Sequence, residues 1–114
     1  MRPHERLDAW KLSMDLVTSI YKYTRNYPKE ELFTLANQMR RAAISIPSNI
    51  AEGSARRSPK EREYFLYMAR GSLSELETQL QISTRLGFLK KADYEKEIGT
   101  CQRVSALIDG LIKS

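Results

Sequence analysis

The sequence predicts an all-α protein folded as an antiparallel up-down-up-down four-helix bundle. Apolar residues recur at steps of three and four along four long segments, which is the period of one helical face. Short connections separate these segments and favour antiparallel neighbours. No segment has the alternating pattern of a strand. The 114 residues fit one domain, so we expect residues 1–114 to form a single bundle.

The composition is that of a globular protein, with 41% hydrophobic and 29% charged residues. No apolar run approaches the roughly 20 residues of a membrane span, and the opening residues lack the apolar core of a signal peptide. We therefore expect a cytoplasmic protein without a membrane partner. The single cysteine, Cys101, excludes an internal disulfide and fits a reducing compartment.

The first predicted helix carries two apolar stripes that lie more than a quarter turn apart. One stripe consists of Leu7, Trp10, Met14, Val17 and Tyr21. The other consists of Leu12, Leu16, Ile20, Tyr23 and Tyr27. Because only one side of a helix can face the bundle, the other stripe needs a second burial surface. We assign the second stripe to an interface between subunits.

The second predicted helix opens at Lys29 and ends near Gly53, a candidate C-terminal cap. Proline removes a backbone donor and clashes one turn back, so Pro47 would normally end a helix. The apolar pattern nevertheless continues in phase through Pro47, which predicts a kinked helix. Its expected core stripe is Leu32, Leu35, Met39, Ala42, Ala43, Ile46 and Ile50.

The third predicted helix has clear signals at both ends. Ser58 fits the N-cap, Pro59 the first helical position and Glu61 the reciprocal acid of a capping box. The apolar pattern then runs to Leu86, and Gly87 fits a C-terminal glycine cap. A fourth helix is expected over residues 92–112.

Apolar residues on outward helix faces predict a homo-oligomer, since aligned exposed apolar residues usually mark an interface. Gly71 would let another helix approach closely. Symmetry is expected, but the periodicity does not give the number of subunits. The predicted interface residues are Leu12, Leu16, Ile20, Tyr23, Ile44, Tyr64, Tyr67, Gly71 and Ile82.

No catalytic or metal-binding motif is present in the sequence. His4 is the only histidine and lies near the N-terminus, whereas Cys101 lies on an apolar helical face and fits a small core residue. A Cys–His nucleophile pair and a Cys/His metal site both lack their ligands. We therefore predict no enzyme activity, no cofactor and no metal.

Basic side chains gather in one part of a chain whose net charge is +5. Residues 40–62 hold six basic side chains against two acidic ones, and the basic ones are Arg40, Arg41, Arg56, Arg57, Lys60 and Arg62. Arg40 lies roughly 20 Å from Gly53 by the helical rise. One phosphate cannot contact both ends of this region, but an extended polyanion can. The alternatives are a solvated helix end or pairing with acids of a neighbouring subunit.

The stretch QMRRAAISIPSNIAEGSARRS resembles the signature of the bacterial four-helix bundle proteins, also called 23S rRNA-intervening sequence proteins. LDAWKLSMDLV, FLYMARGSLSELETQL and RLGFL resemble the flanking helices, so the resemblance extends from about Leu7 to Leu111. The family has no established catalytic residues. Its motif arginines match Arg40, Arg41, Arg56 and Arg57. A related branch, the accessory variability protein of diversity-generating retroelements, resembles a basic homopentamer that associates with a reverse transcriptase and nucleic acid.

The sequence and this resemblance together predict a non-enzymatic, oligomeric bundle that binds RNA or DNA electrostatically with little sequence preference. By the resemblance, a pentamer is the favoured assembly. One alternative is a protein-interaction scaffold, such as a partner of a reverse transcriptase. The other is a purely structural oligomer.

Overall fold

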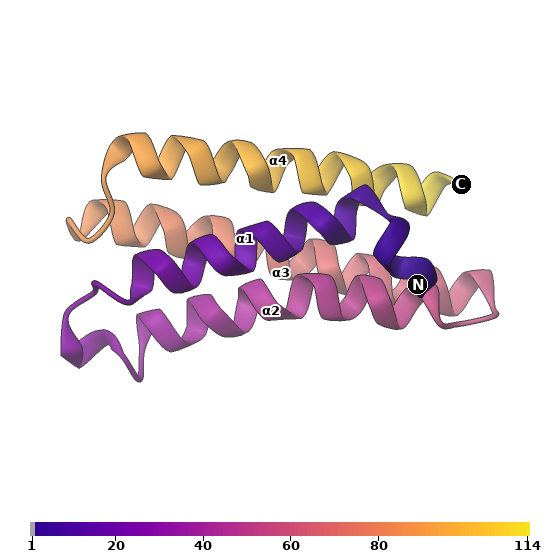
Figure 1. The fold of residues 1–114 in the computed structure, drawn as a ribbon, viewed down its shortest axis with the longest axis horizontal. Coiled ribbons are helices and arrows are strands. Elements are labelled where there is room, and N and C mark those ends of the chain that lie inside the picture. Colours follow the sequence, from indigo (N-terminus) through magenta and orange to yellow (C-terminus); the bar gives the residue numbers. More distant parts are fainter. Residues whose placement is uncertain (1) are drawn as a thin grey trace.

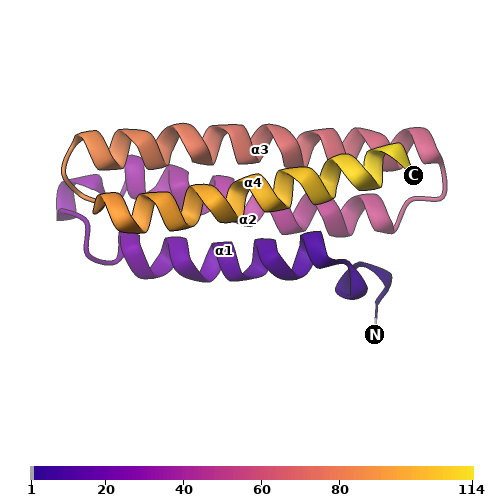
Figure 2. The same ribbon diagram turned by 90° about the horizontal axis from the view of Figure 1, so that it is seen from above.

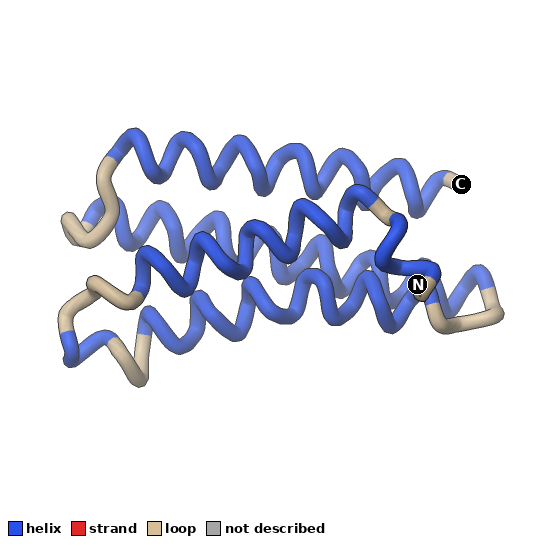
Figure 3. Tube along the Cα trace, viewed as in Figure 1, coloured by secondary structure: helices blue, strands red, loops and turns tan. Residues whose placement is uncertain are grey.

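The computed structural model describes residues 2–114 and is all-helical over that range, with no strand (Figures 1 and 3). Two short 3-10 helices, η1 (Pro3–Arg6) and η2 (Lys29–Glu31), flank the first long helix. The four long helices are α1 (Asp8–Thr24), α2 (Leu35–Ser54), α3 (Pro59–Arg85) and α4 (Lys91–Lys113). The predicted all-α class with four helices is confirmed.

The four helices form one elongated body of 43 × 24 × 23 Å. Each helix packs against the next in the chain, and α4 packs back against α1, which closes a four-sided bundle. In Figures 1 and 2 the α1–α2 and α3–α4 connections lie at one end of the bundle. The α2–α3 connection lies at the other end, near both ends of the chain. No helix within residues 2–114 combines the length and apolar character needed to cross a membrane.

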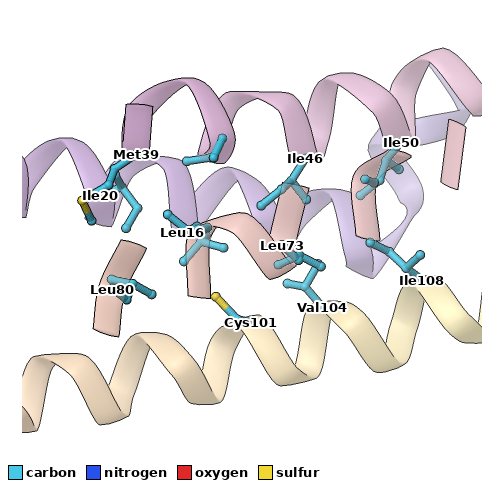
Figure 4. Close-up of a cluster of buried hydrophobic side chains, with 14 of the residues drawn as sticks. Leu16, Ile20, Met39, Ile46, Ile50, Leu73, Leu80, Cys101, Val104 and Ile108 are labelled. Atoms are coloured by element: carbon cyan, nitrogen blue, oxygen red, sulfur yellow. The ribbon is translucent and has the colours of Figure 1, made fainter. Parts of the chain in front are cut away.

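The core is a continuous row of aliphatic side chains along the bundle axis (Figure 4). From α1 it takes Leu16 and Ile20, which are 1% and 0% exposed. Their assignment to a subunit interface is therefore wrong, because they are covered within one chain. Leu12 and Tyr23 are half-buried at the edge of the same face.

The core face of α1 also contains two hydroxyl residues, Ser13 and Thr24. Ser13 Oγ donates to the Trp10 carbonyl at 2.8 Å, and Thr24 Oγ1 donates to the Ile20 carbonyl at 2.7 Å. Local bonds of this kind satisfy the donor of a buried hydroxyl within its own helix. These two polar residues interrupt the apolar stripe that faces the core, which explains why periodicity favoured the other face. That other face leaves Met14 and Tyr21 exposed.

The start of α2 also differs from the prediction. The backbone after Pro28 closes 3-10 turns, in which Leu32 N–H donates to the Lys29 carbonyl at 3.1 Å. The α-helix begins only at Leu35. Leu32 consequently lies before the helix and is 45% exposed, so its assignment to the core stripe is wrong.

α2 continues through Pro47 to Ser54, so the predicted continuation of the helix past this proline is confirmed. Gly53 is not a left-handed cap, because within residues 2–114 only Gly87 has a positive φ. Gly53 is instead buried against α3. A Cβ at this position would lie 3.2 Å from the Arg62 carbonyl oxygen and 3.3 Å from Phe65 Cβ. The glycine therefore permits a close approach of the two helices.

The predicted boundaries of α3 are confirmed. Ser58 Oγ accepts from Glu61 N–H at 3.4 Å and Pro59 occupies the first helical position. At the other end Gly87 has φ +81°, and Phe88 N–H donates to the Ser83 carbonyl at 2.9 Å. These bonds satisfy carbonyls that the end of a helix would otherwise leave free.

Candidate nucleic-acid interface

The α2–α3 turn brings together four of the six predicted basic residues, and we call Arg56, Arg57, Lys60 and Arg62 the turn patch. Within it, Arg62 serves the fold. Its Nε donates to the Arg56 carbonyl at 3.3 Å, and its Nη2 donates to the Arg57 carbonyl at 3.0 Å. Arg62 thus holds the backbone of the turn against the start of α3.

Arg56 is also engaged within the chain. Its Nη2 lies 3.2 Å from Glu52 Oε2 in an exposed ion pair, and its guanidinium lies 5.0 Å from the centre of the Phe65 ring. The carboxylate offsets part of its charge. Arg57 and Lys60, by contrast, are exposed and form no ion pair within residues 2–114. They are the cations of the turn patch that are available to a ligand.

The other predicted pair, Arg40 and Arg41, lies toward the opposite end of α2. Arg40 Nε donates to Thr24 Oγ1 at 2.9 Å, and its guanidinium lies 4.7 Å from the centre of the Tyr21 ring. Arg40 therefore fastens α2 to α1. Arg41 is exposed, and in the described part of the chain it has no ion-pair partner.

The turn patch and the Arg40–Arg41 pair are separate surfaces. Arg40 lies 14 residues before the last residue of α2, which is about 21 Å along the helix axis. Of the six predicted basic residues, three are exposed and have no side-chain partner in the described chain, and they are Arg41, Arg57 and Lys60.

The remaining predicted interface residues lie on the outer surface. Ile44, Tyr64, Tyr67 and Ile82 are all exposed. Gly71 is exposed as well, and a Cβ there would meet nothing within 4 Å. Periodicity missed Met68, which is exposed beside Tyr64 on the same helix. A search for outward positions one turn from Tyr64 would have found it.

An apolar groove between α1 and α2, with a volume of about 320 Å³, was also missed. Its lining residues are Trp10, Met14, Val17, Ile44, Pro47, Ser48 and Ala51. The sequence placed its α1 residues toward the bundle and its α2 residue Ile44 away from it. The structure brings both groups to one outer surface.

A second cavity of about 510 Å³ lies at the end of the bundle where α2 meets α3. Its apolar wall includes Leu7, Leu66 and Leu111, and its polar wall includes Arg56 and Arg62. Both arginines already have partners within the chain. The cavity therefore offers little free positive charge to a ligand.

One buried acid of α4 is paired with a side chain of α1. Glu97 is 2% exposed, and Tyr23 Oη donates to its Oε2 at 2.9 Å. Burial, followed by this carboxylate, raises the pKa of Tyr23. Burial, followed by Glu77 and Glu97, raises the pKa of the Cys101 thiol to about 12. The thiol stays protonated at neutral pH, whereas the thiolate is the nucleophilic form.

Among residues 2–114 no three His, Cys, Asp or Glu side chains lie close enough together to hold a metal ion. His4 lies against Trp10, with ring centres 5.2 Å apart, and not beside Cys101 or Glu97. No histidine therefore joins Cys101 and Glu97, which lie one turn apart on α4.

The chain is similar in structure to a protein of unknown function from Bacteroides thetaiotaomicron that is assigned to the S23 ribosomal protein family. The TM-score is 0.85 at 21% sequence identity, and the match covers 93% of this chain and 96% of that one. This likeness establishes the fold. No curated protein matches the sequence. The family model of the 23S rRNA-intervening sequence proteins matches residues 5–110. The chain therefore belongs to the 23S rRNA-intervening sequence protein family.

Proposed function

We propose that this chain is a non-enzymatic, homo-oligomeric bundle that binds nucleic acid through its phosphates with little sequence preference. The observation that carries the proposal is that some of its basic side chains are used by the fold and others are not. Arg41, Arg57 and Lys60 are exposed without an acidic partner in the described chain, while Arg40 and Arg62 hold the fold. Exposed cations that the fold does not use are suited to contact a polyanion, whereas they contribute nothing to packing of the protein core.

The mechanism is electrostatic. Each cation that neutralises a phosphate releases a condensed counterion, so affinity falls with rising salt. One chain offers only a few such cations, and repetition in an oligomer raises the effective concentration for each further binding event. The family name refers to 23S rRNA and the relative's to a ribosomal protein. These names favour RNA as the first ligand to test.

The assembly we propose is a pentamer, by the resemblance to the accessory variability proteins of retroelements. In this assembly the helices run in up-down-up-down order and α2 bends at Pro47. The exposed apolar groove and the residues Tyr64, Tyr67 and Met68 support association, because contiguous exposed apolar surface favours burial. The groove lies between α1 and α2, whereas the three exposed side chains lie on α3. Two different surfaces of this kind suit head-to-tail packing in a closed ring.

A second candidate is a protein-interaction scaffold, for example a partner of a reverse transcriptase. The apolar groove favours this candidate, since a groove lined by Trp10, Met14 and Ile44 fits an amphipathic helix. In that case the basic residues would dock an acidic or RNA-bound protein.

The test is fluorescence anisotropy with a structured RNA and a DNA duplex across a salt series. The variant Arg41→Ala/Arg57→Ala/Lys60→Ala removes the three predicted basic residues whose side chains have no partner in the described chain. We expect its affinity at low salt to be about tenfold or more weaker than that of wild type. The slope of log affinity against log salt should fall by about 0.9 for each duplex phosphate that the variant no longer neutralises.

The matched control is Lys11→Ala/Lys96→Ala/Lys113→Ala, which removes the same charge from exposed positions on α1 and α4. Light scattering verifies that all three proteins have the same oligomeric mass. An equally weakened control would mean that net charge, and not this surface, causes binding. If wild type fails to bind even at low salt, the nucleic-acid function is wrong and the scaffold becomes the leading candidate.

A further inference from the structure

Phe33 is 86% exposed, more than any other large hydrophobic residue in the described chain. It lies in the turn between η2 and α2, beside Leu32, which is 45% exposed. Single exposed apolar residues are common on protein surfaces. An aromatic ring that is almost fully in water offers both of its faces to a flat ligand.

The turn that carries Phe33 is fixed by hydrogen bonds on both sides of the ring. Thr34 N–H donates to the Glu31 carbonyl at 3.2 Å, and Thr34 Oγ1 donates to Glu31 Oε1 at 3.0 Å. Gln38 N–H then donates to the Thr34 carbonyl at 3.0 Å as the helix begins. A ring held on such a turn loses little backbone freedom when it binds a ligand.

The exposed face of α2 that follows this turn is polar and then basic. Thr34, Asn37, Gln38 and Arg41 are all exposed, and their spacing of three, four and seven residues places them on one face. Arg41 lies seven residues after Thr34, about 10 Å along the axis. The face therefore presents two amides and a free cation, and the turn that carries Phe33 directly precedes it.

We infer that Phe33 is a stacking platform for an unpaired base of a nucleic acid, with Arg41 at a phosphate of the same strand. Every base has a π-face, so stacking tolerates any sequence, and an aromatic ring beside a cationic track is how single strands are held. The inference rests on the proposed function and narrows its ligand from nucleic acid in general to strands with unpaired bases.

A membrane surface suits this site less well. An interfacial anchor needs a broad apolar face with basic flanks. Here the exposed apolar surface of the turn consists of only two side chains, Leu32 and Phe33. The amides of Asn37 and Gln38 suit hydrogen bonding to base edges instead.

The experiment compares a single-stranded RNA carrying 2-aminopurine with a blunt duplex of equal total charge. Phe33→Ala should lower affinity for the single strand about 5- to 100-fold and abolish quenching of the 2-aminopurine, since the ring that stacks on the base is removed. Affinity for the blunt duplex and the salt slope should not change, because phenylalanine is neutral. Phe33→Trp should restore both the affinity and the quenching.

The matched control is Leu86→Ala, which removes another exposed apolar side chain from the connection after α3. It should bind both probes like wild type. If wild type binds both probes and Phe33→Ala changes neither affinity, the stacking site is refuted while the proposed function stands. If wild type binds neither probe, both are refuted.

Two further measurements decide what else Phe33 does. A change in oligomeric mass on Phe33→Ala would place the ring between subunits and overturn the stacking site. Sedimentation with phosphatidylserine vesicles tests a lipid surface. Loss of vesicle binding in Phe33→Ala, with unchanged binding of the single-stranded RNA, would likewise overturn the stacking site.

Discussion

The two arginine pairs of α2 and its following turn look alike in sequence, but the structure divides each pair in the same way. Arg40 is tied to Thr24 and Tyr21 of α1, while its neighbour Arg41 is exposed to solvent. Arg56 contacts Glu52, while its neighbour Arg57 is exposed. The side chain of one arginine in each pair has partners within the chain, and that of the other has none among the described residues.

The two structural arginines differ in the partner they use. Arg40 donates to a neutral hydroxyl on another helix, so it joins two elements and keeps its whole charge. Arg56 faces a carboxylate one turn back, so its charge is partly offset, and its link to another helix is only the contact with the Phe65 ring of α3. Side chains of the same type therefore contribute differently to the free energy of unfolding. Three variants measure these contributions.

The largest effect is expected from Arg40→Ala. It removes a part-buried bond from a charged donor and the packing on Tyr21, which together should lower the free energy of unfolding by about 2 kcal/mol. Arg41→Ala should change it by less than about 0.5 kcal/mol. Urea unfolding followed by circular dichroism measures both. Equal effects of the two variants would contradict the division of roles within this pair.

An intermediate effect is expected from Arg62→Ala, which frees the carbonyls of Arg56 and Arg57 from their donor. Because these groups are exposed, water replaces the missing donor and the cost should be about 1 kcal/mol. Hydrogen exchange should quicken in residues 54–58. The exposed neighbour Lys60→Ala is the control, and faster exchange there too would show that charge alone protects the turn.

The smallest effect is expected from Arg56→Ala. Its ion pair joins side chains that are 41% and 49% exposed, and such pairs contribute about 0.5 kcal/mol or less. The difference from wild type should disappear in high salt. A cost that persists at about 1 M salt, where exposed charges are screened, would instead indicate that the packing of the guanidinium on Phe65 matters more than the charge.

Local signals predicted the ends of α3 well, because the residues that give the signal in the sequence are the same residues that cap the helix in the structure. Ser58, Pro59 and Gly87 are all used as their chemistry requires. The start of α2 was mispredicted for the opposite reason. Lys29 and Glu31 favour a helix start, but the 3-10 turns that follow Pro28 end before Leu35.

The inward face of α1 could not be chosen from periodicity. Two stripes of similar apolar character compete there, and the buried hydroxyls of Ser13 and Thr24 weaken the one that faces the core. Likewise, the basic residues were found from sequence, but their partners were not. The bond from Arg40 to Thr24 joins two helices, and no local pattern encodes such a pairing.

Gly53 limits how this protein can be improved by design. On helix propensity alone, alanine at an interior position gains about 1 kcal/mol over glycine. At Gly53 the added methyl group would press on the Arg62 carbonyl and on Phe65. Any gain in propensity would be offset by pushing α3 away from α2 at the end where Arg62 fastens the turn. An engineer seeking a more stable scaffold should therefore replace Gly99 or Gly110, where a Cβ would meet nothing within 4 Å, and leave this position unchanged.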